Sequence, residues 1–323
     1  MKNITIGMTK NNFEVLRAGI NTTYQDLGRN NLNYIGIPFS GAMDCRNYLI
    51  SNQLVNNNKH TPTIEFAYQG PLIKFNGKET SIAITGNVNF SIIRKNLKLE
   101  KGNCYQSYIL NEGDQVDIIS TDKSVYGYLS VLGGFEAEFF GESCSTNTKA
   151  KIGANNGQRL KQGDKILISE TEKNIKTRKI NYINTKIEQI RVIKGTNFDY
   201  FSEEGKKIFF NSSFEVTKFS DRMGMRLEGQ KIENIINTNI KSEGLIKGVI
   251  QVPADGNPII MLSDHGTIGG YPKIGVVISA DYDKVVQITP GSKIKFKEVA
   301  LSEAENLFKL YNLETQNILN QIK

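Results

Sequence analysis

The sequence has no tryptophan, only two histidines and three cysteines, and no long apolar run. Three cysteines without Cys-x-x-Cys spacing predict reduced thiols rather than a disulfide scaffold, and with two histidines we expect no metal site. No stretch of about 18 apolar residues indicates a membrane span, so no membrane partner is expected. No apolar leader with a small-residue cleavage site follows Met1. These absences together predict a cytoplasmic protein.

The net charge of +7 is carried mostly by lysines that are scattered singly along the 323 residues. No basic stripe with interleaved aromatic residues is present, so we expect no nucleic-acid partner. The sequence also lacks a G-x-x-x-x-G-K-[ST] phosphate loop and a G-x-G-x-x-G phrase after a strand. Any ATP binding must therefore use an unconventional pocket. No Met-Lys-Met phrase occurs, so this chain is expected not to carry biotin itself.

Short β-branched runs bounded by Gly, Asn, Asp and Pro recur along the chain, a pattern typical of barrels and sandwiches. This pattern alone predicts an all-β or α+β chain of two domains. The predicted strands are residues 13–16, 63–66, 81–85, 116–119, 126–132, 165–168, 190–193, 214–216, 249–252, 259–262, 276–279 and 294–296.

Few helices are predicted. One spans residues 44–55 with Asp44 as its N-cap, and the other lies at the C-terminus, where Ser302 and Glu305 can form a capping box before an apolar stripe. The charged, Asn-rich segment 170–186 is typical of a linker. We therefore predict an N-terminal domain of residues 1–175 and a C-terminal domain of residues 176–323.

Two polar phrases near the N-terminus combine reactive side chains with glycine, which permits close backbone approach. Gln25, Asp26 and Arg29 offer an amide, a carboxylate and a guanidinium that could read a lactam or urea; alternatively, Asp26 only closes a turn. Downstream, the phrase Gly36-Ile37-Pro38-Phe39-Ser40-Gly41-Ala42-Met43-Asp44 could present backbone N–H groups to an anion at a helix start. Simple capping by Asp44 is the alternative.

A third phrase, Ser220-Asp221-Arg222-Met223-Gly224-Met225-Arg226-Leu227-Glu228-Gly229, places two arginines four residues apart. If residues 221–227 form a helical turn, Arg222 and Arg226 project from one face and could hold a carboxylate or phosphate, beside Asp221. Alternatively, Arg222 pairs with Asp221 and Arg226 with Glu228 in a solvated loop.

The fourth region holds two stiff phrases. Gln251, Asp255 and Gly256 lie in a loop between two prolines, which favours a binding site, although a tight turn is an alternative. In Gly269-Gly270-Tyr271-Pro272-Lys273 the residue before proline is held extended, and Lys273 presents a single cation suited to a phosphate or carboxylate.

Glu65 interrupts the apolar run Thr63-Ile64-Glu65-Phe66-Ala67-Tyr68. Strict alternation puts this carboxylate on the same face as Thr63 and Ala67, so it could be buried, with a perturbed pKa. The alternative is the solvent face of a strand.

Together these phrases resemble the C-subunit family of bacterial 5-oxoprolinase, also called KipA-like or allophanate-hydrolase-subunit-2-like. That family is similar to one half of the carboxyltransferase domain of urea carboxylase. The resemblance runs from about Phe13 to Phe296 and implies a mainly β (α+β) chain of two cyclophilin-like β-barrel domains, to which the predicted C-terminal helix is added. Two segments depart from the family pattern: Cys144 stands where arginine is expected, and His265-Gly266 where Arg-Gln is common.

The resemblance implies a member of an ATP-dependent 5-oxoprolinase complex, which opens the lactam 5-oxo-L-proline to L-glutamate and acts only with a B-type (KipI-like) and an A-type partner. The catalytic candidates are Asp26, Glu65 and Lys273. The substrate- or nucleotide-binding candidates are Gln25, Arg29, Ser40, Gly41, Asp44, Asp221, Arg222, Arg226, Gln251, Asp255, Gly256, Gly269, Gly270 and Tyr271. Two alternatives stay open: a urea- or allophanate-directed component of a biotin-dependent carboxyltransferase, and a non-enzymatic module that modulates a kinase through its B-type partner.

Overall fold

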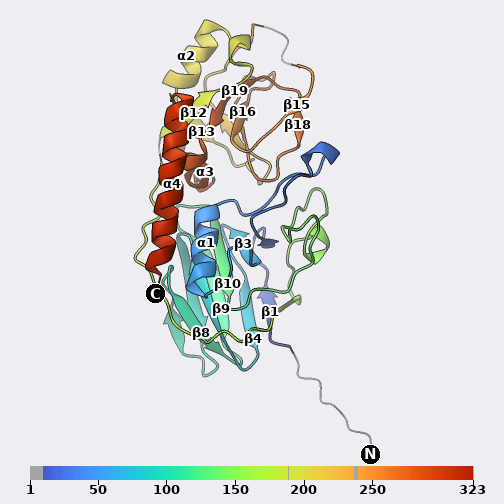
Figure 1. Ribbon diagram of the computed structural model, residues 1–323, viewed down its shortest axis with the longest axis vertical. Coiled ribbons are helices and arrows are strands. Elements are labelled where there is room, and N and C mark those ends of the chain that lie inside the picture. The colour runs from blue at the N-terminus through green and yellow to red at the C-terminus, as the bar shows by residue number, and fades with distance from the viewer. Residues whose placement is uncertain (1–9, 188, 236–238, 323) are drawn as a thin grey trace, which may run out of the picture.

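The computed structural model describes residues 10–187, 189–235 and 239–322 (Figure 1). The strands of the first half form two antiparallel sheets. The six-stranded sheet has the order β11 (Lys165–Leu167), β1 (Asn12–Arg17), β4 (Leu72–Asn76), β9 (Gln115–Thr121), β6 (Val88–Ile93) and β7 (Leu99–Lys101). The five-stranded sheet has the order β2 (Thr23–Gln25), β3 (Thr63–Ala67), β10 (Tyr126–Val131), β5 (Glu79–Thr85) and β8 (Ser107–Asn111).

The two sheets share one apolar core. Alternate residues of β1 and β4 point inward, as Phe13 and Phe75 do, and they pack with Ile84 and Leu129 of the other sheet. Helix α1 (Cys45–Leu54) covers the five-stranded sheet over β5 and β10. It begins where the Asp44 side chain accepts a hydrogen bond from the Asn47 backbone N–H at 3.0 Å.

The second half is a closed barrel, which leaves no exposed sheet edge within it. Its strands follow the order β12 (Gln189–Lys194), β19 (Lys273–Val277), β16 (Val249–Gln251), β17 (Ile259–Met261), β14 (Gly224–Glu228), β13 (Phe214–Val216) and β20 (Lys293–Glu298). A ribbon of two short strands, β15 (Glu243–Gly244) and β18 (Ile268–Gly269), lies beside the barrel. The remaining elements are η1 (Asn33–Ile35), η2 (Asn155–Gly157), η3 (Phe198–Tyr200), α2 (Glu203–Asn211), α3 (Ser279–Val285) and α4 (Leu301–Gln321).

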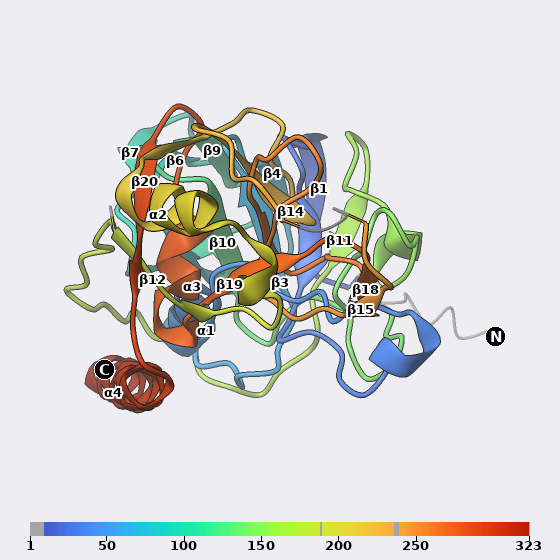
Figure 2. The same ribbon diagram turned by 90° about the horizontal axis from the view of Figure 1, so that it is seen from above.

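The long helix α4 runs along one side of both halves and is seen end-on at the edge of the molecule in Figure 2. It contacts α3 of the second half and α1 of the first. Arg46 of α1 donates from Nε to Thr315 Oγ1 at 3.0 Å, and its guanidinium lies 3.9 Å from the ring centroid of Tyr311. The C-terminal helix therefore fastens the two halves together. No helix within the described ranges is long and apolar enough to cross a membrane.

The predicted mainly β chain with a C-terminal helix is confirmed, as is the capped helix at 44–55. The prediction of a capping box is wrong, because α4 begins at Leu301 with Ala300 as a cap that uses no side chain. The run 276–279 is only partly a strand, since Ser279 opens α3. The strands of the first two sheets end at Leu167 and those of the barrel begin at Gln189, while the boundary at 175/176 stays a prediction.

Candidate functional site

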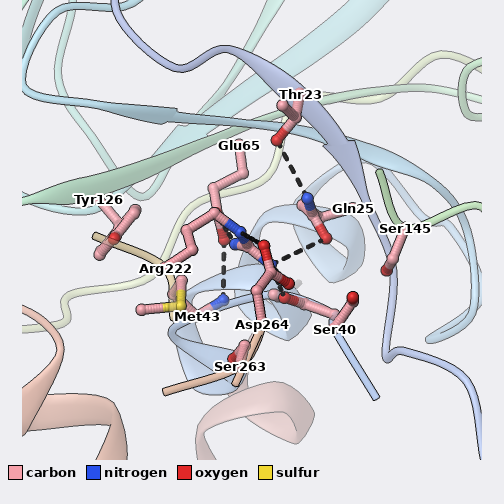
Figure 3. Close-up of polar contacts among 12 residues, drawn as sticks. Thr23, Gln25, Ser40, Met43, Glu65, Tyr126, Ser145, Arg222, Ser263 and Asp264 are labelled. Carbon is pink, nitrogen blue, oxygen red and sulfur yellow. Dashed lines mark hydrogen bonds and ion pairs between the residues drawn. The ribbon is translucent and has the colours of Figure 1, made fainter. Parts of the chain in front are cut away.

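An arginine of the second half is buried where the two halves meet. Arg222, just before β14, is 7% exposed, and its Nε donates to Asp264 Oδ2 at 2.8 Å (Figure 3). Its Nη2 donates to the Gly41 carbonyl at 2.7 Å, and its Nη1 pairs with Glu65. Gln25 Oε1 lies 3.4 Å from Nη2. Two carboxylates, one from each half, therefore enclose a single guanidinium, an arrangement we call the Arg222 network.

Glu65 belongs to β3, a strand with both faces buried, and is completely inaccessible. Besides Arg222, it accepts hydrogen bonds from Tyr128 Oη at 2.7 Å and from the Met43 backbone N–H at 2.8 Å. Burial raises the pKa of Glu65, while the charge of Arg222 and both donors act in the opposite direction. The sequence leaves two alternatives for Glu65, a buried position and the solvent face of a strand, and the structure places it in the buried position.

Asp26 is surrounded by donors from the loop that follows β10. Ser143 Oγ and Ser145 Oγ each donate to Asp26 Oδ1 at 2.6 Å, and the Cys144 N–H donates to Oδ2 at 2.8 Å. Gly28 N also donates to Asp26, as the turn alternative requires. The segment that departs from the family pattern at Cys144 therefore supplies the partners of this carboxylate.

Arg29 is held in the same region and is only 1% exposed. Its Nε donates to the Phe140 carbonyl at 3.2 Å and its Nη2 donates to the Ser145 carbonyl. Burial lowers the pKa of Arg29. Asp26 and Arg29 thus fix a loop rather than face a cavity.

Ser40 and Gly41 bring the chain close to two other segments. Ser40 N donates to the Ser263 carbonyl at 3.0 Å, and Ser40 Oγ accepts from Asn147 Nδ2 at 3.1 Å. Gly41 has φ of 84°, and a Cβ there would lie 2.9 Å from the Gly28 nitrogen. Only glycine meets both conditions, and the carbonyl it presents to Arg222 depends on them.

Asp44 caps α1 and also contacts the second half. It accepts from Asn47 N at 3.0 Å and from Gln287 Nε2 at 2.8 Å. Burial and the nearby charge of Asp283 raise the pKa of Asp44 from 3.8 to about 7. Asp283 itself accepts from the Arg46 backbone N–H at 2.8 Å, so these two carboxylates lie where α1 meets α3.

The prediction that Arg222 and Arg226 share one face of a helical turn is wrong. β14 begins at Gly224, so the chain is extended after a tight turn in which Asp221 Oδ1 accepts from Met223 N at 2.9 Å. Arg222 is buried, whereas Arg226 is exposed on the strand. Arg222 also pairs with Glu65 and Asp264 instead of with Asp221.

The phrase that runs from Gly269 to Lys273 forms a separate cluster around Lys273, the first residue of β19. Lys273 is 4% exposed, and its Nζ lies 2.7 Å from Oε2 of Glu243 on the β15 ribbon. The hydrogen bond and the charge of Lys273 lower the pKa of Glu243. Asn197 Oδ1 accepts from the Lys273 backbone N–H at 3.1 Å. We call this group the Lys273 pair.

Gln251 joins this cluster through its neighbours. Gln251 Nε2 donates to the Tyr271 carbonyl at 3.1 Å, and a Cβ on Gly269 would lie 2.6 Å from the same nitrogen. The carbonyl of Gly270 accepts from Ile240 N at 2.9 Å. The structure therefore brings Gln251 together with the phrase that runs from Gly269 to Lys273.

Asp255 and Gly256 take the turn alternative. Gly256 has φ of 74°, and its N–H donates to the Pro253 carbonyl at 3.0 Å. Asp255 is exposed and accepts from the Asn257 N–H at 3.1 Å. Among the described residues these two contact their own turn and the neighbouring Ile232, and neither the Arg222 network nor the Lys273 pair includes them.

A cavity of about 210 Å³ opens between the halves beside Arg222, and we call it the interdomain cavity. Arg222, Asp264 and Asp221 reach it from the second half, and Lys149 and Arg159 from the first. Its other walls are largely apolar. Sequence reasoning missed Lys149, Arg159, Asp264 and Glu243, because each lies outside the four phrases or carries no local pattern, and only the fold brings them to the sites.

Within the described ranges, no group of three or more His, Cys, Asp or Glu side chains is placed to hold a metal ion. The chemistry available in the interdomain cavity is therefore that of three cations, two carboxylates and an apolar wall. Such a lining suits a small molecule with an anionic group and a compact carbon frame.

Comparison with known proteins agrees with this architecture. Residues 35–298 match the family model described as carboxyltransferase domain, subdomain A and B. The 5-oxoprolinase C subunit of Escherichia coli K12 is 31% identical, with 90% of this chain and 92% of that protein covered, and its namesake from Haemophilus influenzae is 32% identical, with 91% and 93% covered. The crystal structure of Kluyveromyces lactis urea amidolyase superposes with a TM-score of 0.86 at 28% identity, covering 96% of this chain but only 20% of that one. The chain therefore belongs to the family of the carboxyltransferase domain, subdomain A and B, in which it groups with the bacterial C subunits of 5-oxoprolinase.

Proposed function

We propose that this chain is the C subunit of an ATP-dependent 5-oxoprolinase, which converts 5-oxo-L-proline to L-glutamate in the cytoplasm. One observation carries the proposal: the similarity to two proteins named as 5-oxoprolinase C subunits extends over at least 90% of this chain and of each relative. The similarity to urea amidolyase, by contrast, reaches only a fifth of that longer chain.

The interdomain cavity supports this substrate. 5-Oxoproline has one carboxylate, one lactam and a ring of apolar carbons, and a volume of about 210 Å³ accommodates a molecule of this size. Lys149 and Arg159 form no ion pair with a described residue, so both charges are free to meet a substrate carboxylate. Arg222 also lines this cavity, but Glu65 and Asp264 balance its charge and its donors are directed at protein oxygens.

A lactam carbonyl is a poor electrophile, so its hydrolysis needs activation by ATP. Charge that develops on the carbonyl oxygen or a transferred phosphoryl group is stabilised by fixed cations. In this chain Asp26 and Glu65 are enclosed by protein donors, so we assign Glu65 the role of holding Arg222 and Asp26 the role of fixing the loop that carries Ser143 and Ser145. Lys273 keeps its role as an anion contact, reached when Glu243 moves aside.

The proposal includes two partners, the B-type (KipI-like) and A-type subunits, which complete the site. The test is 5-oxoproline-dependent release of ADP by the three subunits together. We expect little turnover by this chain alone, and robust turnover by the single chain would contradict the shared site. Lys149→Gln and Arg159→Gln should each raise the KM for 5-oxoproline about tenfold. The control Lys309→Gln, an exposed lysine of α4, should leave KM unchanged.

A second candidate function is a urea- or allophanate-directed carboxyltransferase component working with a biotin carrier. The superposition on urea amidolyase favours it. The same preparation, supplied with urea, bicarbonate and a biotinylated carrier, separates the two functions. Turnover of urea with none of 5-oxoproline would replace our first proposal by the second.

A further inference from the structure

A second cavity, of about 300 Å³, lies where the two halves and the segment that connects them meet. We call it the lysine cavity. Its walls come from the turns after β5 and β9, from residues 184–187 and from the segment that runs from the end of α3 to the start of β20. Four of its lining residues are lysines, Lys123, Lys186, Lys284 and Lys293. The lining residues that the structure describes include no acidic and no aromatic side chain.

These four lysines are not balanced by the described part of the protein. None of them forms an ion pair with another described residue, although lysines elsewhere do, as Lys194 does with Glu298 at 3.1 Å. Like charges around one concavity repel each other, and a recessed site concentrates their field. A concave surface with four ammonium groups that form no ion pair with a described residue is therefore suited to attract anions.

The remaining lining is suited to oxygen-rich ligands. Ser124, Thr289 and Ser292 contribute hydroxyl groups, and Thr289 Oγ1 lies 3.1 Å from Ser292 Oγ. Hydroxyl and ammonium donors together match phosphate oxygens, which accept several hydrogen bonds at once. Because no described lining residue is aromatic, the usual stacking surface for a nucleobase is not provided.

The lysine cavity and the interdomain cavity share a wall. Ile288 lines both cavities, with Gln287 and Thr289 on the lysine side and Val286 and Pro290 on the other. Likewise, Ser124 lines the lysine cavity and its neighbour Val125 lines the interdomain cavity. An anion in the lysine cavity would therefore contact the loop that borders the interdomain cavity.

We propose that the lysine cavity binds a chain of phosphate groups, the chemistry shared by a nucleoside triphosphate and inorganic tripolyphosphate. The lysines act as separate point charges along the phosphates, and the base contributes little because no described lining residue stacks on it. In naming ATP this proposal rests on the proposed function, but the binding itself is measured with the chain alone. An inactive reconstituted complex would count against the proposed function and leave the lysine cavity standing.

The test is isothermal titration calorimetry of the full chain with tripolyphosphate, ATP and AMP. We expect tripolyphosphate and ATP to bind within about threefold of each other, AMP to bind at least about tenfold more weakly, and all affinities to fall with added salt. The double variant Lys284→Gln/Lys293→Gln should weaken tripolyphosphate binding about tenfold or more, and Lys123→Gln about threefold. Lys309→Gln, which removes the same charge from α4, should bind as the unchanged chain does.

Thermal unfolding of each variant shows whether it is folded. If the double variant is unfolded, the binding of tripolyphosphate to Lys123→Gln tests the site in its place. Unchanged tripolyphosphate binding in the Lys123→Gln and double variants would overturn the site. So would a loss seen only with Lys149→Gln, which would place the phosphates in the interdomain cavity. ATP binding much more tightly than tripolyphosphate would also overturn it, because the base would then carry recognition.

Discussion

The Arg222 network and the Lys273 pair both hold a buried cation, and sequence reasoning assigned both cations to anion binding, yet they are built differently. Arg222 is enclosed by Glu65 and Asp264, whose side chains are 1% and 5% exposed. Lys273 is paired with Glu243 alone, whose side chain is 44% exposed on a two-residue strand. The Arg222 network therefore joins the two halves, whereas the Lys273 pair lies within the second half at its surface.

The difference determines which cation a ligand can reach. Removing one member of a fully buried pair leaves an uncompensated charge, so no substrate replaces Glu65 without disrupting the interface between the halves. A carboxylate at the surface is solvated when it leaves its partner, so Glu243 can yield to an incoming anion at small cost. Arg222 is consequently a structural cation beside the interdomain cavity, and Lys273 is a displaceable one.

The largest expected effect is that of Arg222→Lys. A lysine keeps the charge but cannot donate to Glu65, Asp264 and Gly41 together, so one buried carboxylate loses its partner. We expect the free energy of unfolding to fall by about 3–5 kcal/mol in urea denaturation. The matched control is Arg226→Lys, at an exposed position of β14, which should change the free energy of unfolding by less than about 0.5 kcal/mol. Equal stabilities for the two variants would remove the distinction between the arginines.

Next in size is the effect of Lys273→Met on catalysis by the complex. Methionine keeps the volume of the side chain and removes the charge, so kcat/KM for 5-oxoproline should fall about a hundredfold, equivalent to about 3 kcal/mol. The control Lys194→Met removes the lysine of another ion pair of the barrel, and should leave kcat/KM near that of the unchanged protein. If both variants behave alike, Lys273 is only structural.

A smaller effect is expected for Glu243→Gln. The amide no longer competes as an anion for Lys273, so the KM for 5-oxoproline or for ATP, whichever supplies the anion that Lys273 binds, should fall about threefold, because surface pairs contribute only about 0–1 kcal/mol. Glu298→Gln, which frees Lys194 in the same manner, is the matched comparison. A rise in KM for Glu243→Gln would instead mean that Glu243 itself contacts the substrate.

The smallest effect concerns pH and Asp283→Asn. Because the pKa of Asp44 is raised from 3.8 to about 7, the stability that its neutral form contributes is present below 3.8 and is lost as the pH rises towards 7. Asparagine at 283 keeps an oxygen for Arg46 N but removes the charge that raises this pKa. The variant should therefore gain about 0.5 kcal/mol relative to the unchanged protein between pH 5 and pH 8. A constant difference across that range in urea denaturation would contradict this origin.

Much of the fold could be predicted from local patterns. Short β-branched runs bounded by turn residues located β1, β3 and β10, and the Asp44 cap located α1, because these signals lie within a few residues of each other. Helices α2 and α3 were missed because they are short and their positions depend on tertiary packing. The closure of the barrel joins β12 to β20 across about a hundred residues, which no local pattern reports.

The candidate site was predictable only as a set of residue types. The phrases named Gln25, Gly41 and Arg222 as separate candidates, and the structure brings these three residues into one network. They could not reveal that Arg222 is saturated by protein partners, because Asp264 and Glu65 carry no motif of their own. Lys149 and Arg159 likewise become part of a cavity only when the halves come together.

The contrast between the two buried cations is tested most directly by the coupling energy of each pair, measured by double-mutant cycles in urea denaturation. One cycle combines Arg222→Met with Glu65→Gln, and the other combines Lys273→Met with Glu243→Gln. We expect a coupling energy of at least about 2 kcal/mol for Arg222 and Glu65 and below about 1 kcal/mol for Lys273 and Glu243. Equal coupling energies, or a larger value for Lys273 and Glu243, would contradict the assignment of Arg222 as structural and Lys273 as displaceable.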